Sequence, residues 1–287
     1  MPGPRIAIAT SQGEATAQLD GQGALTPSEN LLIEALASMG AWAVPAVWSD
    51  ENIDWCRFSA VVIRTCWDYH LRVEEFLAWI KSLEEKNVRV INHPDLIRWN
   101  SDKTYLRNFA AKGVAIPETD WLALGEDADV ANICTERGWQ EAVVKPVVSA
   151  SAYGTERRNG GLVRGPMLIQ QYLPAIETEG EWSLIYFDDQ FSHAVRKRPG
   201  PSDFRVQKDH GGSVEVATPS LGLTQFADAA LRELPHPATF ARVDLVEQDG
   251  KVYLMEMEAI EPELFLHHVP KSAHRFASSI LKALAPL

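Results

Sequence analysis

Apolar strands alternate with helical segments through the first ninety of the chain's 287 residues. Strands are expected at 5–10, 43–47, 59–63 and 88–91, and helices at 27–37 and 73–86. Strands that alternate with helices in this way predict a parallel sheet of the α/β type. Ligands of such sheets bind beyond the carboxyl ends of the strands. Ser11 and the segment 64–69 are therefore candidate binding residues.

The pattern changes after residue 100. The expected elements are a helix at 101–112, strands at 142–146 and 167–173, hairpins at 182–195 and 240–258, and a helix from Ser272. Ser101 is expected to cap the first of these helices, and Gly113 to end it. This part of the chain is predicted to be antiparallel β-sheet with a few helices.

Charge and cysteine content exclude several classes of protein. The net charge of −12 disfavours nucleic acid and anionic membrane surfaces as partners. The three cysteines have no metal-ligand spacing, and their odd number argues against a disulfide framework. The N-terminus leads into a strand rather than a signal peptide, and no run of about 20 apolar residues is present. We expect a soluble cytoplasmic protein that binds neither nucleic acid nor membrane.

Three carboxylates stand in the last hairpin, Asp244 on its first strand and Glu256 and Glu258 on its second. Glu256 and Glu258 are two residues apart and share a face of their strand. Converging acids repel each other unless a cation neutralises them. Such an oxygen-rich site suits Mg²⁺ together with substrate phosphates. A solvated hairpin face would carry similar charges, so the hairpin alone leaves a metal site and a plain surface open.

The turn at 248–250 distinguishes these two interpretations. A two-residue Asp-Gly turn would place Asp244 opposite Met255, with its side chain directed away from Glu256. A three-residue loop would place Asp244 opposite Leu254, and all three carboxylates would then share a face. The metal hypothesis therefore requires the three-residue loop.

Lys145 lies in an apolar strand and is followed by proline. A buried lysine is costly without an anionic partner. The next loop, 149–154, consists of small residues apart from Tyr153, and small residues let backbone amides approach phosphate oxygens. The lysine and the loop together favour a phosphate site, whereas the loop alone is compatible with a surface turn.

Arg64, Trp67, Asp68 and Tyr69 directly follow the strand at 59–63. One aromatic residue here would indicate core packing, but the combination favours a substrate wall. With Arg205, the set suits a small zwitterionic amino acid. Asp68 would contact its ammonium group, and an arginine its carboxylate.

Taken in chain order, these features resemble the ATP-grasp superfamily, in which two α+β lobes grip ATP. The resemblance covers roughly residues 100–268, and the α/β segment before it matches the domain that usually precedes this fold. It implies an N-terminal pre-ATP-grasp domain with a Rossmann-like parallel sheet at 1–99, a first lobe at 100–172 and a second lobe at 173–287.

Several stretches are similar to the O-ureido-serine cyclo-ligases of cycloserine biosynthesis. They are RTCWDY at 64–69, GEWSL at 180–184, SHAVRKRP at 192–199, FRVQ at 204–207, ARVDL at 241–245 and MEMEAIEP at 255–262. Bacterial glutathione synthetase is a more distant relative. Its last metal ligand is commonly Asn, whereas this chain has Glu258.

The resemblance implies a role for each candidate nucleotide-binding residue. These would be Lys103 and Lys145 at the α- and β-phosphates, Ser149, Ser151, Tyr153 and Gly154 over the β- and γ-phosphates, the backbone of Gln171 and Leu173 at adenine, and Glu181, or failing that Glu177, at the ribose hydroxyls.

Metal and catalytic roles follow from the same resemblance. Asp244, Glu256 and Glu258 would bind two Mg²⁺ ions, for which Mn²⁺ could substitute. The residues around the γ-phosphate and the substrate carboxylate would be Lys197, Arg205 and Arg242.

Purely structural interpretations stand beside several nearby residues. Arg196 and Arg198 alternate with Lys197 and should face solvent. For Gln170 a plain strand position stays open as an alternative, as does simple solvation for Glu261 and Glu263. The adjacent rings of His267 and His268 are expected to diverge.

The implied activity is an ATP- and Mg²⁺-dependent carboxylate–nitrogen ligase that acts on a small amino-acid-like substrate. Transfer of the γ-phosphoryl group would convert a carboxylate into an acyl phosphate, which a nitrogen then attacks. Ring closure of the cycloserine type is expected, and an intermolecular ligase of the glutathione-synthetase type is the alternative. Loops 11–26 and 149–154 are candidate lids that exclude water.

Two non-catalytic alternatives stay open. One is a nucleotide-binding module with a degenerate ATP-grasp fold, and the other is a small-molecule-binding protein built on the N-terminal domain. Relatives are often dimers or tetramers, so a homodimer or homotetramer is expected.

Overall fold

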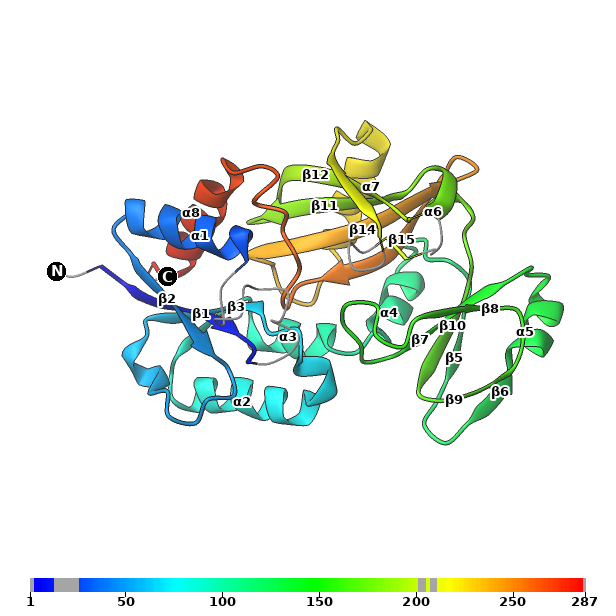
Figure 1. Ribbon diagram of the computed structural model, residues 1–287, viewed down its shortest axis with the longest axis horizontal. Coiled ribbons are helices and arrows are strands. Elements are labelled where there is room, and N and C mark those ends of the chain that lie inside the picture. The colour runs from blue at the N-terminus through cyan, green and yellow to red at the C-terminus, as the bar shows by residue number, and fades with distance from the viewer. Residues whose placement is uncertain (1–2, 13–25, 201–204, 207–210, 286–287) are drawn as a thin grey trace.

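The computed structural model describes residues 3–12, 26–200, 205–206 and 211–285. Figure 1 shows an α/β region that contains both ends of the chain, a long antiparallel sheet beside it, and a smaller sheet at the opposite end. The parallel α/β region thus stands beside two separate regions of antiparallel sheet.

The N-terminal sheet is parallel throughout, with the strand order β2-β1-β3-β4. Its elements are β1 (Arg5–Thr10), α1 (Pro27–Ser38), β2 (Trp42–Val47), the 3-10 turn η2 (Trp55–Arg57), β3 (Ala60–Thr65), the 3-10 turn η3 (Tyr69–Leu71), α2 (Val73–Glu85) and β4 (Arg89–Ile91). Alternate residues of β1 face opposite layers, because Ile6 and Ile8 pack with α1 whereas Ala7 and Ala9 pack with α2. The parallel α/β prediction is confirmed.

The C-terminal helix α8 (Ser272–Ala283) packs against α1 (Figure 1) and shares a hydrophobic core with residues of the N-terminal sheet. Its Phe276 stacks on Phe187 of the long sheet, with ring centroids 5.0 Å apart, and meets Phe240 edge-on at 5.1 Å. The end of the chain therefore packs with the N-terminal region and ties it to the long sheet.

The smaller sheet has the order β5-β10-β7-β8. The elements of this region are α3 (Pro94–Asn100), α4 (Tyr105–Ala111), β5 (Thr119–Leu122), β6 (Asp127–Asp129), α5 (Val130–Arg137), β7 (Ala142–Pro146), β8 (Glu156–Arg158), β9 (Leu162–Arg164) and β10 (Met167–Gln171). One face packs on α5 through residues such as Val144 and Ile169. The other face carries Lys145 and Gln170 into a cavity.

The helix expected from Ser101 is wrong at its start. Ser101 instead ends α3, where its N–H donates to the carbonyl of Ile97 at 3.0 Å. Asp102 then accepts a hydrogen bond from the N–H of Thr104 at 2.8 Å, and α4 begins only at Tyr105. A local side-chain turn of this kind competes with a helical start.

The long sheet is antiparallel, with the order β13-β12-β11-β14-β15. Its elements are α6 (Ala175–Thr178), β11 (Glu181–Phe187), β12 (Gln190–Arg198), β13 (Ser213–Val216), α7 (Leu221–Leu231), β14 (Phe240–Gln248) and β15 (Lys251–Glu258). Leu184, Val243 and Leu245 pack with α4 and α7 on one face. Alternate residues of the same strands, including Asp244, face the cavity.

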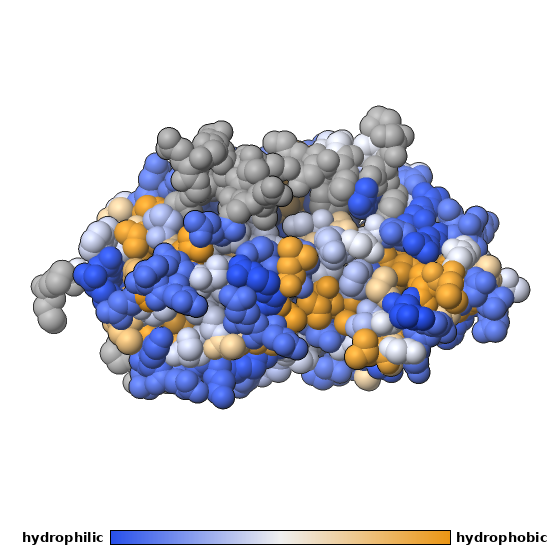
Figure 2. Space-filling view, turned by 60° about the horizontal axis from the view of Figure 1, so that its bottom comes forward, coloured by the Kyte–Doolittle hydropathy of each residue, from blue (hydrophilic) through white to orange (hydrophobic). Residues whose placement is uncertain are grey.

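The surface is mainly polar. Figure 2 shows hydrophilic residues over much of one face, with separate hydrophobic areas between them. The most exposed large apolar side chains of the described part of the chain, Leu124 and Leu221, lie on different elements. None of the described helices combines the length and the apolar character that crossing a membrane requires.

Candidate active site

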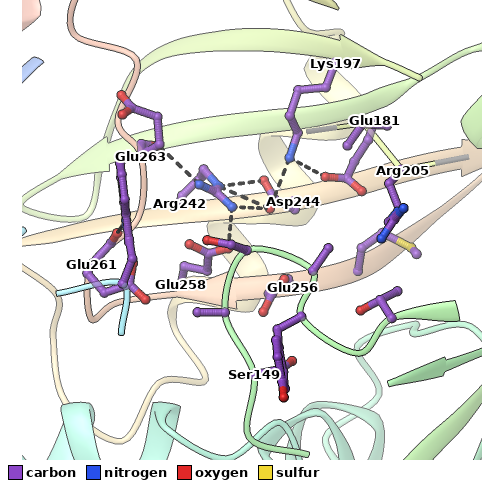
Figure 3. A pocket seen from close by; sticks show the side chains of 18 of the residues that line it. Ser149, Glu181, Lys197, Arg205, Arg242, Asp244, Glu256, Glu258, Glu261 and Glu263 are labelled. Atoms are coloured by element: carbon purple, nitrogen blue, oxygen red, sulfur yellow. Dashed lines mark hydrogen bonds and ion pairs between the residues drawn. The ribbon is translucent and has the colours of Figure 1, made fainter. Parts of the chain in front are cut away.

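A cavity of about 1110 Å³ lies between the smaller sheet and the long sheet. β7 and β10 supply Lys145 and Gln170 from one side, and β12, β14 and β15 supply mainly charged residues from the other. Figure 3 shows these charged side chains converging above the loop that carries Ser149. Segments that follow β3 and β15 complete the wall.

The turn between β14 and β15 has two residues rather than three. Gln248 pairs with Lys251 across Asp249 and Gly250, both of which have positive φ (53° and 73°). This conformation is typical of the tight hairpin turn that the Asp-Gly sequence favours. The three-residue loop that the metal hypothesis required is therefore wrong.

The three carboxylates nevertheless share a face, because a β-bulge corrects the register. Leu245 pairs with Leu254, but Asp244 pairs with Glu256, so Met255 is the extra residue. Oxygens of Asp244, Glu256 and Glu258 all lie within 4.8 Å of one another. The donor set is entirely carboxylate and suits a hard divalent cation such as Mg²⁺.

Cations hold Asp244 from two sides. The guanidinium of Arg242 binds it in a bidentate manner, with Nε to Oδ1 at 3.0 Å and Nη2 to Oδ2 at 2.9 Å, and also contacts Glu258. Lys197 Nζ lies 3.4 Å from Asp244 Oδ2 and pairs with Glu181 (Figure 3). Burial opposes ionisation, but Arg242 and Lys197 lower the pKa of Asp244 to about 2. The carboxylate is therefore ionised, and both of its oxygens are held by these cations.

The other two carboxylates differ in their electrostatic surroundings. Burial raises the pKa of Glu258 to about 7, despite the attraction of Arg242. Burial acts in the same direction on Glu256, but Lys103 outweighs it and holds the pKa of Glu256 below its ordinary value. Lys103 Nζ pairs with Glu256 and donates to the carbonyl of Ser149 at 3.1 Å.

Lys145 contacts no carboxylate in the part of the chain that the structure describes. Among the described residues, its Nζ donates one hydrogen bond to a side chain, Gln170 Oε1 at 3.0 Å. Burial lowers the pKa of Lys145. A phosphate group in the cavity would supply the missing counter-charge. Gln170, for which a plain strand position was an alternative, lines the cavity and orients this lysine.

The loop after β7 has a strained backbone. Ser151, Ala152 and Gly154 have φ values of 50°, 56° and 65°. Ser149, Ser151 and Tyr153 line the cavity. Gly154 does not line it, and a Cβ there would approach Pro146 Cγ to 2.8 Å. Gly154 therefore shapes the loop by its conformation and lack of a side chain.

Apolar residues line one end of the cavity. Val143, Leu173, Ile176 and Met255 line it there and suit a flat aromatic ring. The N–H of Gln171 donates to the carbonyl of Glu118 at 2.8 Å. Gln171 and Leu173 both lie on this wall.

The predicted substrate wall is only partly present. Trp67 and Tyr69 line the cavity. Arg64 does not, because its buried guanidinium pairs with Glu29 at 3.1 Å and donates to the carbonyl of Pro262 at 2.9 Å. The placement of Arg64 on the wall is therefore wrong.

Asp68 and Ser11 also lie off the described cavity wall. Asp68 accepts hydrogen bonds from Trp48 Nε1 at 2.8 Å and from Arg72 at 2.6 Å. Ser11 is buried, with its hydroxyl donating to the carbonyl of Thr65 at 3.0 Å. Both side chains are held within the N-terminal region, so their predicted substrate contacts are corrected. Most of the candidate lid at 11–26 lies outside the described residues.

The segment after β15 supplies residues that the sequence interpretation missed. Glu261 is 8% exposed and lines the cavity beside Glu263, so the alternative that Glu261 is simply solvated is wrong. His267 and His268 also line the cavity, and their ring centroids are 4.3 Å apart rather than diverging. The available signal was that Glu261 and Glu263 follow Glu258 at the end of β15 within five residues.

The charged residues beside Lys197 behave as expected. Arg196 pairs with Glu179, and Arg198 pairs with Glu215, away from the described cavity wall. Lys197 itself lines the cavity, as do Arg205 and Arg242. The alternation along β12 thus separates one cavity cation from two surface cations.

Comparison with known proteins agrees with this architecture. D-alanine–D-alanine ligase from Bacillus anthracis superimposes with a TM-score of 0.69 at 16% identity, covering 98% of this chain and 97% of that chain. The ATP-grasp RimK domain protein from Sphaerobacter thermophilus gives a TM-score of 0.66 at 17% identity, covering 96% and 99%. The fold is therefore the ATP-grasp fold, and the protein is an ATP-dependent ligase.

Closer relatives identify the family. The family model for the N-terminal domain of D-cycloserine synthetase DcsG matches residues 6–92. The cycloserine biosynthesis protein DcsG of Streptomyces lavendulae is 32% identical over 283 residues, covering 89% of this chain and 93% of the relative. The crystal structure of D-cycloserine synthetase DcsG superimposes with a TM-score of 0.82 at 28% identity, covering 98% of this chain and 100% of that chain. The chain belongs to the DcsG family, which confirms the predicted resemblance.

Proposed function

We propose that this protein closes O-ureido-serine into the cycloserine ring, using ATP and Mg²⁺ and an acyl-phosphate intermediate. The proposal rests on one observation: the three clustered carboxylates Asp244, Glu256 and Glu258 line the same cavity as Lys103 and Lys145. The similar proteins include a cycloserine biosynthesis protein and a D-cycloserine synthetase, which supports the choice of substrate.

The nucleotide is proposed to lie across the two lobes. Adenine occupies the apolar end at Leu173 and Met255. The phosphates extend toward Lys145, which lacks a carboxylate partner among the described residues, and toward Lys103. Glu181, which pairs with Lys197, faces the ribose. This arrangement directs the γ-phosphate toward the three carboxylates.

The three carboxylates would hold two Mg²⁺ ions, and bound Mg²⁺ would neutralise charge on the phosphate oxygens. Arg242 already contacts two of the carboxylates and fixes their orientation. Lys197, Arg205 and Arg242 line the same region and stabilise negative charge on the transferring phosphoryl group and on the substrate carboxylate.

The chemical route follows from the poor leaving group of a carboxylate. The γ-phosphorus forms a bond to a substrate carboxylate oxygen as its bond to the β,γ-bridging oxygen breaks, and ADP departs. The nitrogen bonded to the side-chain oxygen of ureido-serine then attacks the acyl carbon, loses its proton and expels phosphate. The ring nitrogen still carries the carbamoyl group at this point, so release of cycloserine requires its hydrolysis by water to ammonia and carbon dioxide. Ring closure needs no second amino acid, which distinguishes it from the intermolecular alternative.

Product analysis tests this proposal. Wild-type protein with MgATP and D- or L-O-ureido-serine should release ADP and phosphate and consume no other amino acid. Hydroxylamine added during turnover should trap the acyl phosphate as a hydroxamate. Release of AMP would contradict the acyl-phosphate route, a requirement for a second amino acid would favour intermolecular ligation, and ATP binding without turnover would favour a non-catalytic module.

We further propose three units at 1–99, 100–172 and 173–287 and a homodimer or homotetramer. Light scattering on the purified chain tests the assembly. A mass equal to one chain would contradict it.

A further inference from the structure

The segment that follows β15 is clamped through three consecutive carbonyl groups. Trp67 Nε1 donates to the carbonyl of Glu261 at 3.4 Å. Arg64 donates to the carbonyl of Pro262 at 2.9 Å, and Arg242 to that of Glu263 at 3.3 Å. The donors come from the end of β3, the loop after it, and β14. The backbone that presents Glu261 and Glu263 is therefore fixed before any ligand binds.

The two glutamates of this segment have opposite surroundings. Glu263 Oε1 accepts hydrogen bonds from the hydroxyl of Ser28 at 2.9 Å and from the N–H of Phe265 at 2.6 Å. Glu261 is 8% exposed, and its carboxylate has neither a hydrogen bond nor an ion pair within the described ranges. Glu263 thus has a structural role, whereas the carboxylate of Glu261 lacks a partner.

A buried carboxylate without a partner is unfavourable unless a ligand completes it. The missing ligand is a hydrogen-bond donor with positive charge. Glu261 lies outside the group of three carboxylates whose oxygens are within 4.8 Å of one another. Figure 3 nevertheless places it on the same side of the cavity as Glu258 and Glu263. The ligand is therefore adjacent to the metal cluster and separate from it.

An α-amino acid has this geometry. Its ammonium group stands on the carbon next to the carboxylate, so a carboxylate held for phosphoryl transfer near Arg242 places the ammonium group close by. We propose that Glu261 binds the α-ammonium group of the amino-acid substrate, with Trp67, Arg64 and Arg242 positioning it. The inference rests on the proposed ligase function and gives Glu261 the role that Asp68 cannot fill, because Asp68 is held by Trp48 and Arg72.

Matched substrate pairs test the assignment. Each pair consists of an amino acid and the same acid without its ammonium group, namely O-ureido-serine with 3-(ureidooxy)propanoate, D-alanine with propanoate, and serine with 3-hydroxypropanoate. ADP formation is measured for the wild type, Glu261→Gln and the control Glu34→Gln, which removes an exposed charge from α1. The wild type should prefer the amino member of whichever pair it uses.

In Glu261→Gln, kcat/KM for the amino compound should fall roughly 30-fold or more, because a buried charge pair is lost. The rate with the compound that lacks the ammonium group should stay within about threefold, and the control should match the wild type. The Tm without ligand should not fall, because Glu261 has no described partner to lose. Half-saturation by Mg²⁺ should also be unchanged.

Three outcomes would overturn the assignment. The first is a wild type that prefers no amino compound over its counterpart. The second is an equal loss for both members of a pair. The third is a shift in the Mg²⁺ requirement with an unchanged amino preference, which would make Glu261 a metal ligand. Turnover of another pair but not of ureido-serine would refute the proposed substrate, and the effect of Glu261→Gln would still be read on the pair that reacts.

Discussion

Asp244 on β14 lies directly opposite Glu256 on β15, although the two-residue turn between the strands would by itself place Asp244 opposite Met255. The bulge at Met255 turns Glu256 and Glu258 back to the face of Asp244. The extra residue packs with Leu173 and Tyr172 at the apolar end of the cavity. One backbone irregularity thus serves both the acidic cluster and the proposed adenine pocket.

The last of the three acidic residues is Glu258, where bacterial glutathione synthetase commonly has Asn. This difference leads to a first prediction. Glu258→Asn should fold, because Arg242 keeps its bidentate contact with Asp244. The Mg²⁺ concentration for half-maximal ADP formation should rise roughly tenfold, equivalent to about 1.4 kcal/mol. Glu256→Gln should lose nearly all activity at any Mg²⁺ concentration. Equal losses in both variants would contradict a distinction between these carboxylates.

The two cavity lysines should respond differently to removal. Lys145→Met should weaken ATP binding roughly 10- to 100-fold without lowering the Tm of the free protein, because Lys145 contacts no carboxylate among the described residues. Lys103→Met should weaken ATP binding and also destabilise the free protein by about 1–3 kcal/mol, because Glu256 loses its partner. Calorimetry measures both quantities. A lower Tm for Lys145→Met would show that it has an unrecognised structural partner.

The buried pair of Glu29 and Arg64 should be structural. Arg64→Met leaves Glu29 as an uncompensated buried charge and should reduce the free energy of unfolding by about 3–5 kcal/mol. The double variant Glu29→Gln/Arg64→Met should recover part of this loss in urea titrations. It should still show a raised KM for the amino acid, because the hydrogen bond to the carbonyl of Pro262 is gone. Full recovery of KM would contradict the clamp.

His193 should contribute to stability in a pH-dependent way. The ring is buried, its Nε2 lies 2.9 Å from the carbonyl of Leu264, and burial lowers its pKa from 6.5 to about 4. The unfolded chain takes up a proton at higher pH than the folded chain does, so stability is fully present above pH 6.5 and is lost as the pH falls to about 4. The shift corresponds to roughly 3 kcal/mol.

Urea titrations of the wild type and His193→Gln test this prediction. The amide of glutamine can still donate to Leu264 but does not titrate, so the difference in unfolding free energy between the two proteins isolates the histidine. That difference should change between pH 6.5 and pH 4 and be constant above. A difference that is independent of pH would show that folding does not lower the pKa of His193.

The sequence predicted elements that depend on local patterns. The strand at Arg5–Thr10, the helix from Pro27 and the turns at Asp188 and Gly250 follow from apolar runs, a proline in the first helical turn and residues that accept positive φ. The sequence could not give the bulge at Met255, because a bulge is specified by the packing of both strands against their neighbours. The start of α4 was missed for a related reason, since Asp102 forms a local turn before Tyr105.

The sequence by itself determined the alternation that makes the N-terminal sheet parallel, the family, and the two-residue spacing that keeps Glu256 and Glu258 on one face. Only the tertiary structure decided which charges face the cavity. Arg64 and Asp68 lie within three residues of Trp67 in the chain, yet contacts with Glu29 and Trp48 hold them away from the cavity wall. Glu261 enters it because two strands and a loop from distant parts of the chain hold the backbone of its segment. The spacing of residues along one strand fixes the face to which each side chain points. Whether that side chain is buried, and which groups it contacts, depends on the elements that pack against the strand.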